Sequence, residues 1–285
     1  MDTRFLQSLI IVIETGSIAA AARRQNLTAA AVSQRIKSLE NSLNCRLLSR
    51  AGHSAKATQA CLRILPRLKR IAAEVSCIST DLDSKQLSGE LRIGVISTLL
   101  SGVLPRCVQY LANSAPKLLL QIVPGTSKAL YQQLQEQQID LAILIQPPFK
   151  VAKVLKAEFL FAEPLALISL GPSSAINQSI RKQTFIQYDK NAWGGAIANS
   201  YLVDQKISVT PLCEIDSLES IALMVKMGMG VSLVPHWQGL QALASNLHIS
   251  PIEDTKYQRN IQLLSHRQSG REQLIAEFKR ALSSV

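Results

Sequence analysis

The sequence predicts an α/β protein in three parts: a small helical domain with a short hairpin, one long helix, and a larger domain of alternating strands and helices. Residues 3–43 carry apolar positions at helical spacing, and residues 59–88 repeat apolar residues four and three apart. From Gly89 onward, short apolar runs alternate with helical segments. We therefore place the three parts at residues 1–58, 59–88 and 89–285.

Length and charge indicate the kind of partner. The chain has 285 residues, of which 47% are hydrophobic, so both end domains have enough apolar material for a core. Residues 1–58 carry eight Lys and Arg against three Asp and Glu, whereas residues 89–285 carry eighteen against fourteen. The positive excess per residue is therefore highest at the N-terminus, which favours a domain that binds a polyanion such as nucleic acid.

Apolar runs, histidines and cysteines argue against other classes. No apolar run reaches the roughly 20 residues of a membrane span, and the first residues lack the layout of a signal peptide, so we expect a cytoplasmic protein. The four histidines show no metal-ligand spacing, and we expect no metal and no cofactor. The cysteines are scattered without a C-x-x-C pair, which indicates reduced thiols. They are Cys45, Cys61, Cys77, Cys107 and Cys213.

Two helices are predicted first. Apolar residues such as Phe5 and Leu9 share one face over residues 3–15. Gly16 ends that helix, and Ser17 can cap the next one, which is short and rich in alanine.

The stretch from Asn26 to Leu43 predicts the helix around which the N-terminal domain is organised, with Thr28 as its N-cap. Its apolar stripe consists of Val32, Ile36, Leu39 and Leu43. The opposite face is small, polar and basic, and consists of Ala30, Gln34, Lys37 and Asn41, with Ser33 on its flank. Such a face can enter a DNA major groove, although an ordinary amphipathic surface helix has the same pattern.

Two short strands around Gly52 are predicted next, and together they form a small wing. Its basic residues are Arg46, Arg50, His53 and Lys56. Two helices joined by a tight turn and followed by such a hairpin make a winged helix-turn-helix, whose wing lies along the DNA backbone or minor groove. We expect DNA contacts from Arg23, Thr28, Ala29, Ala30, Ser33, Gln34, Lys37, Arg50, His53 and Lys56.

Residues 1–61 resemble the winged helix-turn-helix of LysR-type transcriptional regulators, without gaps. The residues that carry the resemblance are Phe5, Leu6, Gly16, Ser17, Ala21, Ala22, Leu27, Thr28, Ala31, Val32, Ser33, Ile36, Leu39, Glu40, Leu43, Leu47, Leu48, Arg50 and Thr58.

This chain departs from the family pattern at the start of the third helix. Ala29 and Ala30 stand where the family commonly has Gln-Pro, so the family's base contact there is not carried over. Ala29 can still touch a thymine methyl group. Leu48 replaces a common aromatic residue, and Cys61 replaces a common glycine.

Residues 59–88 predict a long helix whose apolar seam fits a partner helix. The seam consists of Cys61, Leu65, Leu68, Ala72, Val75, Ser79 and Leu82. The resemblance implies that the partner is the same helix of a second subunit, and tetramers are common in the family. Packing against the chain's own C-terminal domain is the alternative, and Pro66 predicts a kink or a late helix start. The expected dimerisation residues are Leu65, Leu68, Ala72, Val75 and Leu82.

The C-terminal part alternates strands and helices, which predicts a parallel sheet. Strands are predicted over residues 91–96, 118–123, 139–145, 159–169, 184–188, 231–234 and 261–265, with another ending at 215. Helices are predicted over residues 99–113, 127–138, 217–227 and 271–282.

This part resembles the effector-binding domain of the same family. The matching residues are the run Gly89 to Gly94, Gly125 and Thr126, Asp140, Asp216 and Ser217, and the run Gly228 to Pro235. The resemblance implies two lobes like those of periplasmic solute-binding proteins. Lobe I is expected at about residues 89–162 and 264–285, and lobe II at about 163–263.

A ligand pocket is expected where strands of lobe I turn into helices, because helix N-termini present free N–H groups there. The opposite wall is expected from residues 188–195 and from Gly230 and Val231. Hydroxyls at helix starts favour a carboxylate or another anion, although capping alone also explains them. Neither turn holds Arg or Lys, so we expect a weakly charged ligand or one held by backbone groups. The expected contacts are Ser97, Thr98, Thr126, Ser127, Ile145, Trp193 and Val231.

These features together predict a transcriptional regulator that binds promoter DNA and responds to a small-molecule effector, with RNA polymerase as a further candidate partner. Three alternatives remain at this point. A redox sensor of the same family would use Cys107 and Cys213. An enzyme would need partners for Glu214 and Asp216 that the sequence does not supply. A purely architectural DNA-binding protein would not need the large C-terminal part.

Overall fold

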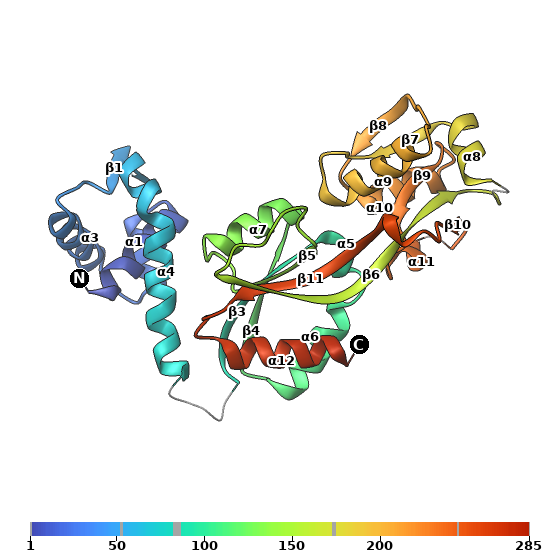
Figure 1. Ribbon diagram of the computed structural model, residues 1–285. Helices are drawn as coiled ribbons and strands as arrows, with labels where there is room; N and C mark the ends of the chain where they lie inside the picture. Colours follow the sequence, from blue (N-terminus) through green and yellow to red (C-terminus); the bar gives the residue numbers. More distant parts are fainter. Residues whose placement is uncertain (1, 52–53, 82–86, 173–174, 244, 285) are drawn as a thin grey trace. The chain divides into compact units, whose positions relative to one another are not determined.

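The computed structural model describes residues 2–51, 54–81, 87–172, 175–243 and 245–284. The chain divides into two compact units, with the boundary after residue 85 (Figure 1). The expected DNA contact His53, the turn at Gly52 and the expected seam residue Leu82 lie outside the described residues.

The N-terminal unit forms the helices and the hairpin that its sequence predicts. Its elements are α1 (Thr3–Thr15), α2 (Ile18–Arg24), α3 (Ala29–Leu43), β1 (Leu48–Ala51), β2 (Ser54–Ala57) and α4 (Gln59–Asp81). Gly16 follows α1 with a φ of +67°, in the left-handed region that strains any residue with a Cβ. The side chains of Ser17 and Thr28 accept hydrogen bonds from backbone N–H groups of α2 and α3, so both predicted caps are present.

Two apolar clusters form the core of this unit. One joins α1, α3 and α4 around Leu9 and Leu39, and the other joins α1, α2 and α3 around Val32 and Ile36. Leu43 was expected in the buried stripe, but it is 38% exposed because α3 ends at this residue.

The expected seam of α4 is partly wrong, because its first half packs on the chain's own N-terminal domain. Cys61 is fully buried and Leu68 is only 4% exposed, and both lie in the cluster with Leu9. Val75, further along the helix, is 38% exposed. Pro66 lies inside α4, which already begins at Gln59, so a late helix start is also wrong.

Within the described part of the chain, no single helix is long and apolar enough to cross a membrane. α1 and α2 meet a length and composition test only together, across a bend of 119°.

The C-terminal unit contains a mixed sheet with the strand order β10-β6-β11-β5-β3-β4, and β9 pairs with β6. Figure 1 shows α6 and α12 on one face of its first part and α7 on the other. The strands are β3 (Gly89–Val95), β4 (Leu118–Pro124), β5 (Leu141–Ile145), β6 (Leu155–Ser169), β7 (Phe185–Tyr188), β8 (Pro211–Ile215), β9 (Ser232–Pro235), β10 (His248–Pro251) and β11 (Gln258–His266). The helices are α5 (Ser97–Leu100), α6 (Leu104–Ser114), α7 (Ser127–Gln135), α8 (Ile176–Lys182), α9 (Trp193–Asp204), α10 (Leu218–Lys226), α11 (Leu240–Leu243), the 3-10 turn Thr255–Tyr257 and α12 (Glu272–Ser283).

Two lobes share this sheet, and the long strands β6 and β11 run through both. β3 pairs in parallel with β4 and β5, as predicted, whereas β11 is antiparallel to both β5 and β6. Lobe I has one large apolar core between its helices and sheet, and lobe II has two smaller ones. β6 and β11 pair along Leu155 to Pro164, with an irregularity between Ile261 and Gln262, so an antiparallel ladder joins the two lobes.

Several elements differ from the prediction. The helix expected over residues 99–113 is split into α5 and α6, and Pro105 lies in the first turn of α6, where it is tolerated. α7 ends at Gln135, before Gln137 adopts a φ of +55°. The sequence prediction also lacked α8, α9, α11 and β10.

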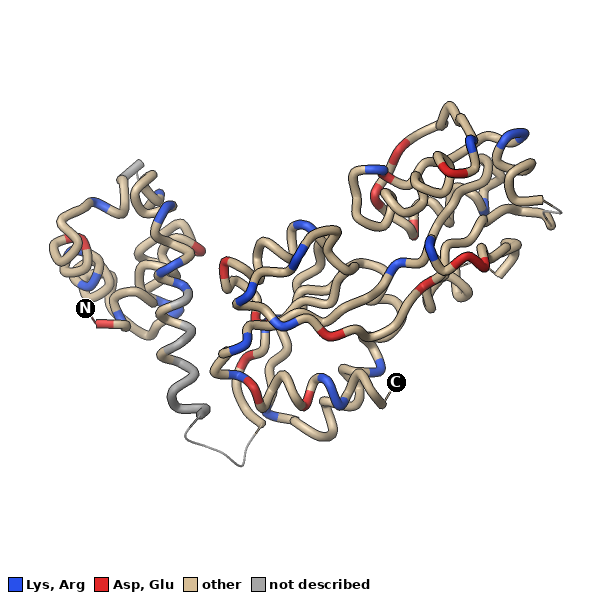
Figure 2. Tube along the Cα trace, viewed as in Figure 1, with Lys and Arg blue, Asp and Glu red and all other residues tan. Residues whose placement is uncertain are grey.

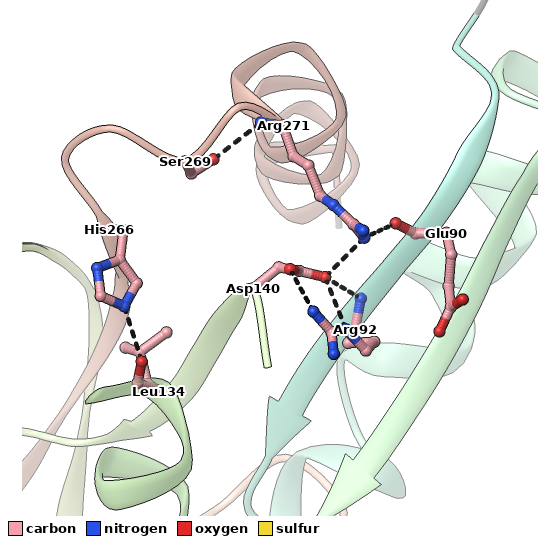
Figure 3. Close-up of polar contacts among 7 residues, drawn as sticks. All are labelled: Glu90, Arg92, Leu134, Asp140, His266, Ser269 and Arg271. Carbon is pink, nitrogen blue, oxygen red and sulfur yellow. Dashed lines mark hydrogen bonds and ion pairs between the residues drawn. The ribbon is translucent and has the colours of Figure 1, made fainter. Parts of the chain in front are cut away.

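The carboxylate of Asp140 connects β3, β5 and the start of α12 (Figure 3). Its Oδ2 accepts hydrogen bonds from Arg92 N at 2.7 Å and from Arg271 Nη1 at 2.9 Å, while its Oδ1 lies 3.2 Å from Arg92 Nη2. Arg271 also donates to the carbonyl of Glu90. Asp140 and both arginine side chains are largely shielded from water. One carboxylate therefore joins the first strand of lobe I, β3, to its last helix, α12.

We expect Asp140→Asn to lower the free energy of unfolding by about 2–4 kcal/mol, because two shielded guanidinium groups lose their counter-charge. The measurement is urea denaturation. Asp204→Asn is the matched control, since the Asp204–Lys256 ion pair is solvent-exposed, and it should leave the midpoint almost unchanged. Equal small effects of both substitutions would contradict a structural role for Asp140.

Candidate DNA-binding surface and ligand cavity

The predicted recognition face of α3 is exposed in the N-terminal unit. Thr28, Ala29, Ala30, Gln34 and Lys37 are exposed, and Ser33 is half-buried. Figure 2 shows Lys and Arg spread over this unit with few acidic residues between them.

The other expected DNA contacts lie on α2 and the wing. Arg23 at the end of α2 and Lys56 on β2 are both exposed. Arg50 belongs to β1, but the placement of its side chain lies outside what the structure describes.

Partly buried polar contacts fix the orientation of α3. The guanidinium Nη1 of Arg35 donates to Ser8 Oγ at 3.2 Å, and that hydroxyl donates to Gln25 Oε1 at 2.8 Å. The carboxylate of Glu40 accepts from the backbone N–H groups of Leu47 and Leu48, at 2.7 and 3.1 Å. Arg35 thus ties α3 to α1 and α2, and Glu40 ties it to the wing. The sequence analysis did not assign these positioning roles.

A cavity of about 500 Å³ lies between the two lobes of the C-terminal unit. Lobe I contributes residues 96–98, 124–128 and Ile145, and lobe II contributes residues from 188 to 193 with Asp216. The expected contacts that line it are Ser97, Thr98, Thr126, Ser127, Ile145 and Trp193.

Val231 was also expected at this cavity, and the structure corrects that expectation. It is fully buried in an apolar core of lobe II, where it forms a parallel bridge with Phe185. It therefore packs within the lobe and does not line the cavity.

Arg259 is the cavity residue that the sequence analysis missed. It lies on β11 directly opposite Glu163 on β6, and its Nε donates to Glu163 Oε2. Its Nη2 donates to Thr98 Oγ1 at 2.7 Å, and the residue is only 3% exposed. The expectation of a weakly charged ligand rested on the absence of Arg or Lys from the two turns. The cavity nevertheless contains the Arg259 guanidinium, and Lys128 also lines it.

The hydroxyls of the second turn already have structural partners. Ser127 Oγ accepts from Ile145 N at 3.1 Å, and Thr126 Oγ1 caps α7 by accepting from Ala129 N at 3.3 Å. α5 is a single short turn, so the first turn offers little helix dipole. The positive charge of Arg259 is therefore the stronger anion-attracting feature.

Acidic groups balance this charge in lobe II. Burial raises the pKa of Asp216, the nearby charge of Asp189 raises it further, and Arg259 opposes both effects. Burial likewise raises the pKa of Tyr188 to about 12, although Arg259 acts in the opposite direction. Both signs of charge thus face the same cavity.

An aromatic cluster connects the two lobes beside the cavity. Trp193 at the start of α9 lies edge-to-face with Tyr131 and Phe149 of lobe I, at ring-centroid distances of 6.2 and 5.6 Å. Tyr131 and Phe149 are themselves 5.2 Å apart. Such pairs are favourable beyond the area they bury, so this cluster favours the lobe arrangement seen here.

The two cysteines of the redox alternative, Cys107 and Cys213, lie in different lobes. Cys107 is fully buried in the core of lobe I, and burial raises the pKa of its thiol to about 11, which disfavours the reactive thiolate. Cys213 lies on β8 in lobe II, with its Sγ 3.9 Å from Met224 Sδ. Among the described residues, no group of His, Cys, Asp and Glu side chains is placed to hold a metal ion.

Each of the two units matches a known protein-family model. The model for the bacterial regulatory helix-turn-helix protein, lysR family, matches residues 3–62, and the LysR substrate binding domain matches residues 84–285. The chain therefore belongs to the LysR family of DNA-binding transcriptional regulators with an effector-binding domain, and it is not an enzyme.

Curated relatives and solved structures extend over nearly the whole chain. The transcriptional regulator CfxR of Cupriavidus necator is 27% identical over 269 residues, which are 91% of this chain and 84% of that protein. The probable regulator LrrA of Synechococcus elongatus is 27% identical over 241 residues, or 82% of this chain and 81% of that protein.

Two full-length structures show the same fold. A variant of OxyR from Pseudomonas aeruginosa has a TM-score of 0.74 and 19% identity, covering 99% of this chain and 94% of that one. CbnR complexed with its target DNA has a TM-score of 0.71 and 17% identity, covering 100% of this chain and 99% of that one.

We expect Gln34→Ala to weaken binding to the cognate DNA site by about 1–3 kcal/mol and to weaken binding to random DNA much less, because Gln34 is exposed on the recognition face. Lys37→Ala is the contrasting variant, because a lysine that contacts a phosphate strengthens binding to any DNA sequence. This variant should lower the salt-dependence slope by about one unit. Fluorescence anisotropy at several salt concentrations measures both. Equal losses on cognate and random DNA for Gln34→Ala would contradict this docking of α3.

Proposed function

We propose that the effector of this regulator is a small carboxylate that also carries a hydroxyl or amino group, bound in the cavity between the lobes. The buried guanidinium of Arg259, hydrogen-bonded to Thr98 at the cavity wall, is the observation that carries this proposal. Arginine suits planar recognition of a carboxylate because its fork of donors forms paired hydrogen bonds.

The remaining groups of the cavity suit the rest of such a molecule. A guanidinium has five N–H donors, more than its contacts with Glu163 and Thr98 use. Asp216 and Asp189 can accept hydrogen bonds from a hydroxyl or amino group of the same ligand. Trp193 supplies an apolar wall, and Ser97 and Lys128 add polar groups on the side of lobe I.

A ligand held in this way would contact both lobes and would therefore favour one lobe arrangement over others. The regulator would bind promoter DNA through α3 and the wing. It would act in the bacterial cytoplasm, where RNA polymerase is a candidate partner. Changed lobe positions would then alter how the subunits of an oligomer are arranged on DNA.

Pairing of subunits is proposed through the second half of α4. The stripe that buries Leu68 within its own domain continues along the helix to Ala72 and Val75. Leu65 is half-buried beside it. An exposed valine in line with a buried leucine supports a helix partner from a second copy, and two half-sites on DNA require such a dimer.

We expect Val75→Glu to shift the protein towards monomers without unfolding the N-terminal domain, because like charges would meet across paired helices. Leu68→Glu should instead unfold that domain, since it places a charge in its core. Sedimentation velocity and thermal unfolding separate the two effects. An unchanged oligomer for a folded Val75→Glu protein would place the dimer contact elsewhere.

The effector proposal is tested with Thr98→Val. A thermal-shift screen of short hydroxy- and amino-carboxylates first identifies a binding compound, and calorimetry gives its affinity. We expect the affinity to fall roughly tenfold to a hundredfold, because the hydroxyl that positions Arg259 is lost. The substitution should also lower the free energy of unfolding by about 1–3 kcal/mol, since a buried donor of Arg259 loses its acceptor.

Thr255→Val, at an exposed site in lobe II, is the matched control and should leave the affinity unchanged. An unchanged affinity in a folded Thr98→Val protein would mean that the carboxylate binds elsewhere.

A further inference from the structure

Sulfur-containing side chains gather in one part of lobe II. Three of the chain's four methionines, at positions 224, 227 and 229, lie in the last turn of α10 and just beyond it. Cys213 lies on β8, and its Sγ is 3.9 Å from the Sδ of Met224. Two soft sulfur atoms from separate elements are therefore in direct contact.

A further methionine is available beside this sulfur pair. Cys213 and Met224 are half-buried, whereas Met227 is 78% exposed. Met227 follows Met224 by three positions, so both side chains leave the helix on the same face. A methionine side chain has three rotatable bonds, so the thioether of Met227 can turn towards the pair without a change in the backbone.

The distance between the two sulfur atoms matches a trigonal metal site. Three sulfur atoms that bind one ion at about 2.3 Å each lie about 4.0 Å from one another. The separation of 3.9 Å between Cys213 Sγ and Met224 Sδ is close to that value. The two atoms are therefore already placed as two of three ligands.

The types of ligand select the kind of ion. Thiolate and thioether sulfur favour Cu(I), whereas carboxylate and carbonyl oxygen favour Mg²⁺ and Ca²⁺. The part of the chain that the structure describes has no group of three His, Cys, Asp or Glu side chains that could hold a metal ion. Zn²⁺, whose sites are built from those side chains, therefore lacks its ligands here.

We propose that Cys213, Met224 and Met227 form a trigonal site for one Cu(I) ion. The Cys213 thiol releases its proton to solvent as the bond from Sγ to the metal forms, and each thioether donates a lone pair without losing a proton. The ion keeps its oxidation state, so no oxidant or reductant is consumed.

A bound ion would connect α10 to β8 within lobe II. α10 begins at Leu218, which lines the cavity between the lobes, so the ion acts on a helix that reaches that cavity. The regulator would then respond to a metal ion as well as to its effector. The metal site itself does not rest on the proposed carboxylate effector.

The test uses reduced full-length protein under anaerobic conditions, titrated with Cu(I) against a chromophoric Cu(I) chelator as competitor. We expect Cys213→Ser to lower the affinity roughly a hundredfold or more, because the thiolate ligand is lost. Met224→Leu and Met227→Leu should each lower it roughly tenfold, since leucine keeps the side-chain volume and removes the thioether. X-ray absorption should show three sulfur neighbours of the bound copper in the unsubstituted protein.

Two matched controls remove sulfur atoms outside the proposed site. Met229→Leu removes an exposed thioether just beyond α10, and Cys45→Ser removes an exposed thiol of the N-terminal unit. Both variants should bind Cu(I) at Cys213 with unchanged affinity. A loss in Met229→Leu protein without one in Met227→Leu protein would contradict the proposed third ligand.

Two results would overturn the site: unchanged affinity in folded Met224→Leu protein, or equal losses in Cys45→Ser and Cys213→Ser proteins. The first would mean that the contact between the two sulfur atoms is packing alone. The second would mean that Cu(I) binds to exposed thiols without a built site. Circular dichroism shows whether each variant is folded. Loss of carboxylate binding with intact Cu(I) binding would contradict only the proposed effector.

Discussion

The ion pair between Arg259 and Glu163 lies on the two strands that connect the lobes of the C-terminal unit, and the arrangement of both lobes depends on it. The two residues are register partners on β11 and β6, the strands that run through both lobes. Both are almost fully buried, and Thr98 of lobe I is held by the same guanidinium. A buried ion pair is seldom more stable than well-packed apolar residues, whereas breaking one is strongly unfavourable. Because Arg259 lines the cavity between the lobes, this ion pair suits a role in ligand recognition as well as in stability.

The N-terminal unit shows the opposite use of charge. Its partly buried polar contacts, such as those of Ser8 with Arg35 and Gln25, hold the helices together. The described residues of the recognition face form no ion pair within the chain. Glu40 holds the wing through backbone N–H groups. The orientation of α3 is thus set from within, and Gln34 and Lys37 remain exposed on its outer face. Binding of DNA and binding of a ligand therefore depend on separate sets of interactions.

Local signals in the sequence predicted the elements that local physics determines. Thr28 and Ser17 cap their helices, and the stripe through Val32 and Ile36 is buried, because capping and periodicity act over a few residues. Arg259 could not be found in this way, since its partners lie 96 and 161 residues away in the chain. Periodicity along α4 likewise showed an apolar stripe without showing which part of it packs on its own domain.

The same geometry limits how an effector can act. A ligand shifts the lobes only by the difference between its affinities for their alternative arrangements. The ring of Trp193 already packs against Tyr131 and Phe149. These contacts stabilise the observed arrangement of the lobes without any ligand. A carboxylate at Arg259 would bind to β11, one of the two strands that run through both lobes, whereas a group at Asp216 would bind lobe II alone. A ligand that reaches both therefore has the larger difference in affinity between lobe arrangements, and this is why two opposite charges in one cavity suit a regulator.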